Sequence, residues 1–261
     1  MCATNLTLGV NWEFSRDRIG DYRSGYLTDA ESWQQADAIV ASACFPPVFG
    51  PMRVDRHPSS YSGGKYQGGD RDQLLRRIHL SDGGLYDNLA LEPVWKTHRT
   101  IIVSDAGAPF PFWEGGGGVL GRMKRYASVL SRQSQSVRKR LLFHLAASGQ
   151  AQVVYIPLAG VLGTFSPESP HAVLGSRRVI ARLHRFRTDL DGLLPCEASL
   201  LEAYGYLMAS ERLRVASFTM PEQRTVSVPL VEEEAFRCLD GSSHRLSFRR
   251  FAKQLAERGT K

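Results

Sequence analysis

Apolar and polar residues alternate along the chain in a way that predicts a mixture of strands and helices. Residues 1–27 alternate loosely, as short strands joined by turns do. Residues 30–44 are mostly small or apolar, so we expect a helix there. Thr28 and Glu31 have the spacing of a capping box, and Asp29 is a rival N-cap one residue on. The Phe-Pro-Pro sequence that starts at Phe45 would end this helix, because proline cannot continue it.

The pattern then changes to that of an α/β layer. Residues 53–76 are polar and glycine-rich and are predicted to form a surface loop or a β-hairpin excursion. A short apolar run, residues 78–80, leads into Asp82, and residues 88–96 are predicted to be helical. Residues 100–104 are a β-branched run of the kind found in buried parallel strands. A strand, a helix and another strand in this order indicate an α/β layer.

One long helix is predicted over residues 119–147, and two interpretations of it are open. Its apolar positions fall mostly on one stripe, and its other faces are basic. The helix either packs its stripe on a core and solvates the basic face, or lies on an anionic membrane. The apolar positions are Leu120, Met123, Ala127, Leu130, Val137, Leu141 and Leu145, and the basic ones are Arg122, Lys124, Arg125, Arg132, Arg138, Lys139 and Arg140.

The C-terminal part is predicted to be mostly helical. A strand is expected at 153–158, a short helix at 172–183, and a longer helix at 193–209 that begins at Pro195. The tail adds a possible strand at 225–231 and a helix at 248–257.

The composition, 43% hydrophobic and 23% charged over 261 residues, is that of a globular protein. No run of about 18 apolar residues predicts a membrane span, and residues 1–7 lack the pattern of a signal peptide. We therefore expect a cytoplasmic or membrane-peripheral protein. The net charge of +7 favours anionic partners, which are phospholipid head groups, nucleic acid or acidic substrates, and selects none of them. The basic residues are spread out and accompany no recognisable nucleic-acid module, which argues against nucleic acid.

Most familiar catalytic and binding patterns are absent from the sequence. No serine stands in a Gly-x-Ser-x-Gly elbow, and the seven histidines are isolated. The four glycines at 115–118 lack the Lys-Ser/Thr of a phosphate loop, so a linker is favoured. The four cysteines, at positions 2, 44, 196 and 238, indicate neither a zinc site nor a disulfide framework. We therefore predict no cofactor, no metal site and, by default, a reducing compartment.

Two turns place an aspartate after a short strand, at Asp82 and Asp105. Either carboxylate could be a general base if burial or hydrogen bonds changed its environment, because an ordinary Asp has a pKa near ~3.9. Gly83 and Gly84 follow Asp82 and predict a tight turn, since glycine adopts backbone angles that other residues avoid. Such a turn could aim the carboxylate into a ligand cleft, or the aspartate could only cap its own backbone.

Three stretches together resemble the patatin-like phospholipases. Residues 41–49, Ala-Ser-Ala-Cys-Phe-Pro-Pro-Val-Phe, resemble the A-S-x-A-x-P-x-x-F segment of that family, with Cys44 in place of the usual alanine. Residues 79–91, which contain Asp82-Gly83-Gly84, resemble its D-G-G/A catalytic aspartate motif. Ala-Thr-Asn-Leu at 3–6, with Gly9, resembles the strand before a small helix in the family. The likeness covers about residues 1–110, and weaker likeness continues at 187–190 and 205–206.

The resemblance implies a partial three-layer α/β/α domain over residues 1–110. Residues 111–261 would then form a helical or mixed C-terminal region packed on it. The family uses a serine–aspartate dyad to cleave fatty-acyl esters, with the aspartate as direct base of a Gly-x-Ser-x-Gly serine. Asp82 matches the aspartate, and Gly83 and Gly84 match its supporting turn.

The serine and the oxyanion glycines of the family match nothing in this chain, and in the family both precede the matching segments. We therefore expect the C-terminal portion of a lipid acyl hydrolase that is inactive alone, with a lipid or acyl ester as the substrate of the complete enzyme. The alternative is a non-catalytic basic protein that binds anionic membranes or nucleic acid.

Overall fold

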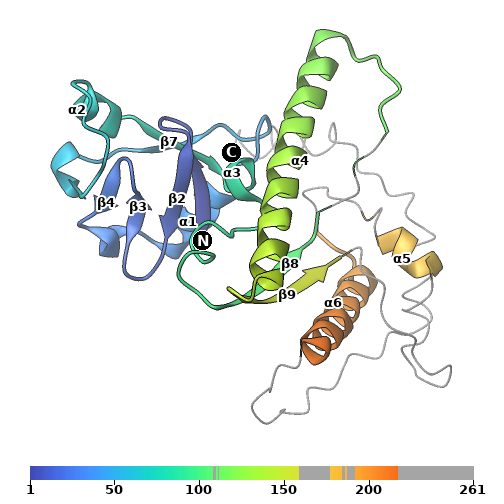
Figure 1. The fold of residues 1–261 in the computed structure, drawn as a ribbon. Coiled ribbons are helices and arrows are strands. Elements are labelled where there is room, and N and C mark those ends of the chain that lie inside the picture. The colour runs from blue at the N-terminus through green and yellow to red at the C-terminus, as the bar shows by residue number, and fades with distance from the viewer. Residues whose placement is uncertain (108–109, 111, 159–176, 184–185, 187–191, 217–261) are drawn as a thin grey trace. The chain divides into compact units, whose positions relative to one another are not determined.

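The computed structural model describes residues 1–107, 110, 112–158, 177–183, 186 and 192–216 (Figure 1). The chain forms two compact units. The first contains residues 1–101 and 113–153, and the second contains residues 102–112 and the chain from 154 onward. The predicted strand at 225–231 and helix at 248–257 lie outside the described residues.

A curled, seven-stranded antiparallel sheet forms the centre of the first unit, so the protein is a mixed α/β protein. The strand order is β5-β7-β1-β2-β3-β4-β6. The short strands predicted within residues 1–27 are confirmed. The seven strands are β1 (Cys2–Asn5), β2 (Val10–Phe14), β3 (Ile19–Asp21), β4 (Gly25–Leu27), β5 (Met52–Val54), β6 (Tyr61–Ser62) and β7 (Ile78–Asp82).

The sheet forms because its strands bury apolar side chains against one another and against helix α1 (Gln35–Ser42). Trp12 is completely buried and packs edge-on against Tyr61. Ala38 and Ala41 of α1 belong to the same cluster, and such small side chains let a helix approach a sheet closely. This packing holds β1 and β7 side by side, with Ala3 opposite Asp82.

The helix predicted at 30–44 is shorter than expected. Residues Ala30–Ser32 form a separate 3-10 turn, η1, and α1 begins only at Gln35. The cap is not at Thr28, because the backbone N–H of Gln34 donates to the carboxylate of Asp37 at 3.1 Å and starts the helix there. The helix ends at Ser42, before the proline pair, as predicted.

The segments on either side of β7 also differ from the sequence prediction. Residues 53–76 contain β5, β6, the 3-10 turn η2 (Pro58–Ser60) and helix α2 (Arg71–Leu75) rather than one loop or hairpin. The helix expected at 88–96 is absent from that range. Instead, a single helical turn, α3 (Gly84–Asp87), follows Asp82 directly, and hydrogen-bonded turns occupy residues 91–98.

The strand at 100–104 is confirmed as β8 (Thr100–Asp105), which pairs with β9 (Gln152–Pro157). The N–H of Gln152 donates to Arg99 and that of Leu158 to Asp105, so the two strands run in the same direction. Their connection contains α4 (Gly118–Ala147), the predicted long helix. Alternate residues of β8 are exposed, so this parallel strand is buried on one side only.

The apolar stripe predicted for α4 is not buried as a whole. Leu142 and Leu145, near its C-terminal end, are buried. In contrast, Leu120 and Leu130 are 81% and 71% exposed. Only the C-terminal part of α4 is therefore packed on a core, as the first of the two interpretations expects.

Helices α5 (Arg177–Leu183) and α6 (Pro195–Val215) form the core of the second unit. The predicted start of α6 is confirmed, because Pro195 occupies its first turn and the Glu197 carboxylate accepts the N–H of Leu194 at 2.8 Å. Cys196 is disulfide-bonded, which the cysteine spacing did not indicate, whereas Cys2 and Cys44 are free thiols.

Candidate functional site

Asp82 is the last residue of β7, and three hydrogen bonds hold the backbone around it. Its N–H donates to the carbonyl of Cys44 at 3.1 Å, and its carbonyl accepts the Thr4 hydroxyl at 2.7 Å. The N–H of Gly83 donates to the carbonyl of Ser42 at 3.3 Å. The end of β7 is therefore fixed from both sides, by β1 and by the C-terminal end of α1 with the residues after it.

Thr4 also connects β1 to the turn after Asp82. Its hydroxyl donates to the Asp82 carbonyl and accepts the N–H of Tyr86 at 3.1 Å. Nothing about the residue type predicted this role. The only signal was the position of Thr4 within the Ala-Thr-Asn-Leu stretch.

The Asp82 carboxylate is half-buried and oriented by one local contact. Its Oδ1 accepts the N–H of Gly84 at 2.7 Å. Burial raises the pKa of this carboxyl above its usual value, and the hydrogen bond from Gly84 offsets part of the increase. Asp82 is therefore a stronger base than an exposed aspartate, which is the property that a catalytic aspartate requires.

The raised pKa of Asp82 predicts that Asp82→Asn stabilises the protein at neutral pH. The folded state binds this proton more tightly than the unfolded state does, so wild-type stability falls as the pH rises from about 3.8 through the folded pKa. Asparagine retains an oxygen that can accept the Gly84 N–H but has no charge to bury. We expect a higher Tm for Asp82→Asn at pH 7, with the difference shrinking toward zero below about pH 4. Thermal melts across pH 3.5–8 measure this, and an equal or lower Tm at pH 7 would contradict it.

The two glycines after Asp82 are needed for space rather than for unusual backbone angles, which corrects the sequence argument. Gly83 has an ordinary right-handed conformation with φ −61°. A Cβ on Gly83 would lie 2.5 Å from the backbone oxygen of Cys2. One on Gly84 would lie 2.8 Å from the Asn88 side-chain oxygen and 2.9 Å from the Asp82 carboxylate. Gly83 thus lets the turn contact β1, and Gly84 leaves room for the carboxylate.

Gly83→Ala is expected to destabilise the first unit by about 1–3 kcal/mol, the range for inserting a methyl group into a packed site. The clash is with backbone of β1, which is paired on both sides and cannot move aside. Gly69→Ala is the matched control, since its added methyl would meet nothing within 4 Å. Urea denaturation followed by tryptophan fluorescence reports the effect, and equal midpoints for the two variants would contradict it.

A cavity of about 360 Å³ opens beside the Asp82 turn. Ser42 and Cys2 bring a hydroxyl and a thiol to this cavity, but neither is hydrogen-bonded to Asp82. Burial raises the pKa of the Cys2 thiol, which disfavours the thiolate. The cavity is lined by Met1, Cys2, Ser42, Asp82, Gly83, Gly84, Asp87, Asn88 and Ala90.

Asp87 is a second carboxylate at this cavity, and sequence reasoning gave it no role. Its side chain is completely buried and lies 3.2 Å from the guanidinium Nε of Arg138 in α4. It also accepts the N–H groups of Leu89 and Glu92, at 3.1 and 2.9 Å. Arg138 in turn lies over the ring of Tyr86. Because its oxygens are engaged in this way, Asp87 connects α3 to α4 and is not positioned as a free base.

Asp105, the other aspartate that follows a strand, has both carboxylate oxygens in hydrogen bonds. Oδ1 accepts the N–H of Gly107 at 2.9 Å, and Oδ2 accepts the hydroxyl of Tyr155. The residue is buried. These contacts favour a structural role in joining β8 to β9.

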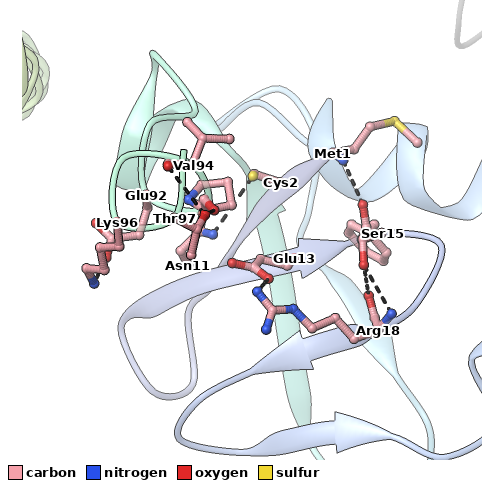
Figure 2. Close-up of polar contacts among 12 residues, drawn as sticks. Met1, Cys2, Asn11, Glu13, Ser15, Arg18, Glu92, Val94, Lys96 and Thr97 are labelled. Carbon is pink, nitrogen blue, oxygen red and sulfur yellow. Dashed lines mark hydrogen bonds and ion pairs between the residues drawn. The ribbon is translucent and has the colours of Figure 1, made fainter. Parts of the chain in front are cut away.

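A larger cavity, of about 460 Å³, lies beside β2 and residues 92–97 (Figure 2). Its charged side chains are largely paired with each other, Glu13 with Arg18 and Glu92 with Lys96, both at 2.8 Å. The cation of each pair is at least half exposed, so these pairs contribute little to stability. Asp21 and Lys65 also line the cavity. Across the described residues, no group of three or more His, Cys, Asp or Glu side chains is placed to hold a metal ion.

No family model matches the chain, and no curated protein matches it significantly. Within the residues that the structure describes, no helix combines the length and apolar character needed to cross a bilayer.

Proposed function

We propose that this chain is the base-bearing part of a patatin-like lipid acyl hydrolase, with Asp82 as the catalytic base. The proposal rests on the resemblance of residues 1–110 to that family. The supporting observation is the position of Asp82: the end of a strand, half-buried beside a cavity, with one carboxylate oxygen held by the Gly84 N–H. The three motif stretches, residues 3–6, 41–49 and 79–91, contact one another at Asp82. Ala3 pairs with Asp82 in the sheet, and the N–H groups of Asp82 and Gly83 donate to Cys44 and Ser42.

In the proposed reaction, Asp82 takes the proton of a serine hydroxyl while that oxygen attacks the carbonyl carbon of a fatty-acyl ester. The protonated Asp82 then gives the proton to the departing alcohol, which leaves an acyl-serine. A water molecule, deprotonated by Asp82, then attacks this ester, and Asp82 returns the proton to the serine oxygen as the fatty acid is released. The raised pKa of Asp82 favours both proton transfers, since the residue must accept and return a proton.

The nucleophilic serine in this proposal is supplied from outside these 261 residues, because no serine here lies in Gly-x-Ser-x-Gly. The finer fold expectation belongs to the same proposal. The antiparallel sheet with α1 and α3 would be part of a three-layer α/β/α domain that the remaining segment completes.

An active-site probe tests the proposal directly. A fluorophosphonate should label the protein encoded by the reading frame extended upstream through a Gly-x-Ser-x-Gly codon sequence, and should leave the 261-residue chain unlabelled. Labelling of the chain itself, lost in Ser42→Ala, would place the nucleophile at Ser42 and contradict the proposal. A reading frame with no such sequence upstream would contradict it as well.

A further inference from the structure

The N-terminal part of α4 presents an apolar surface to solvent. Its exposed side chains, which we call the α4 stripe, include Met123 at 61% and Leu130 at 71% exposure. At 3.6 residues per turn, every member lies within about 60° of the direction of Met123 around the helix axis. The stripe consists of Val119, Leu120, Met123, Tyr126 and Leu130.

Positive charge borders this stripe on both sides. Arg122 and Lys124 immediately flank Met123 in sequence, so they lie about 100° to either side of it around the helix. Lysine and arginine occupy seven of the 30 positions of α4, and aspartate and glutamate occupy none. Trp113, which precedes the helix by five residues, is 44% exposed.

The other end of α4 is anchored to the first unit. Gln135, Leu142 and Leu145 are buried, and Arg138 is bound to the buried Asp87 of α3. Figure 1 shows the first turns of α4 extending beyond α3. The helix therefore has a fixed C-terminal part and an N-terminal part whose apolar side chains face solvent.

We propose that the N-terminal part of α4 docks this protein on the surface of an anionic phospholipid membrane. An apolar stripe bordered by Arg and Lys, with an exposed tryptophan five residues before the helix, matches the headgroup–acyl boundary, where apolar side chains enter the lipid and cations meet phosphate. A nucleic acid would use the cations but leave the stripe in water. The absence of acidic residues from α4 complements a negative surface and disfavours a basic protein partner. This inference does not depend on the proposed hydrolase activity.

Vesicle co-sedimentation of the full chain tests the proposal. Vesicles of phosphatidylcholine with phosphatidylserine should bind the protein, pure phosphatidylcholine vesicles should not, and 0.5 M salt should weaken binding. The double variant Met123→Ser/Leu130→Ser should bind about tenfold more weakly or worse, since it removes two inserted apolar side chains. Val40→Ser, at an exposed apolar position of α1, is the control and should bind like wild type.

A second pair of variants separates local charge from net charge. Arg122→Gln/Lys124→Gln should weaken binding about thirtyfold, because each cation near an anionic surface contributes substantially to affinity. Arg16→Gln/Arg77→Gln removes the same charge from exposed positions elsewhere and should have a small effect. The proposal is overturned if both pairs weaken binding equally, if Met123→Ser/Leu130→Ser binds normally, or if the stripe mediates a dimer with no vesicle binding.

Discussion

Asp82→Asn should lower kcat for ester hydrolysis by at least about 10⁴-fold in the extended protein that contains the serine. Loss of the group that takes the nucleophile's proton has effects of this order or larger in serine hydrolases. Asparagine keeps the shape of the side chain and an acceptor for the Gly84 N–H, so the turn is preserved and only the basic oxygen is lost. Turnover of a p-nitrophenyl fatty-acyl ester measures the effect, with KM expected to change little.

Asp105→Asn is the informative comparison for that experiment, because Asp105 is the other aspartate that the sequence places after a strand. Its carboxylate is bound by Gly107 and Tyr155, so we expect its substitution to affect stability more than the chemical step. Tm at pH 7 separates the two outcomes, since Asp82→Asn should be inactive yet more stable than wild type. Activity retained in Asp82→Asn and lost in a folded Asp105→Asn protein would move the base to Asp105.

Asp87→Ala should destabilise the first unit by about 3–5 kcal/mol, which is the usual consequence of removing one partner of a buried ion pair. The substitution leaves the Arg138 guanidinium, itself only 19% exposed, without its carboxylate. It also leaves the N–H groups of Leu89 and Glu92 without their acceptor. Urea denaturation followed by tryptophan fluorescence measures the change, because all four tryptophans belong to the first unit.

A double-mutant cycle with Arg138→Met tests whether the ion pair itself carries this effect. Adding Arg138→Met to Asp87→Ala should have a smaller effect than Arg138→Met alone, because the partner charge is already gone. Arg140→Met, at an exposed position of the same helix, is the control and should change stability by less than about 0.5 kcal/mol. Additive effects of Asp87→Ala and Arg138→Met would show that the contact between α3 and α4 does not depend on the pair.

The elements that the sequence predicted well are those whose signal is local. β8 and α4 were predicted within one or two residues, because a β-branched run and a long 3.6-residue period need no distant partner to be recognised. The strand that ends at Asp82 was predicted for the same reason. The start of α1 was misplaced, since the helix begins at the cap formed by Gln34 and Asp37 and not at the Thr28–Glu31 spacing predicted from the sequence.

Several contacts of the candidate site join residues far apart in the chain, and the local sequence did not predict them. Sequence identified the Asp82-Gly83-Gly84 turn but gave the wrong reason for its glycines. The backbone that Gly83 must clear belongs to Cys2, some 80 positions earlier. The contact of Thr4 with Asp82 and the ion pair of Asp87 with Arg138 were not predicted either, because their members are also far apart in sequence. A contact between residues far apart in the chain leaves no periodic trace in either segment.

The sequence by itself determined the strand that ends at Asp82, the length of α4 and the basic character of that helix, because propensity, period and charge are properties of neighbouring residues. Only the tertiary structure decided that the Asp82 carboxylate is half-buried beside a cavity, that Asp87 is bound to Arg138, and that the first turns of α4 expose their apolar side chains. Burial and pairing depend on which segments the fold brings together. The pKa of a carboxylate and the exposure of an apolar stripe are therefore set by the fold and not by the local sequence.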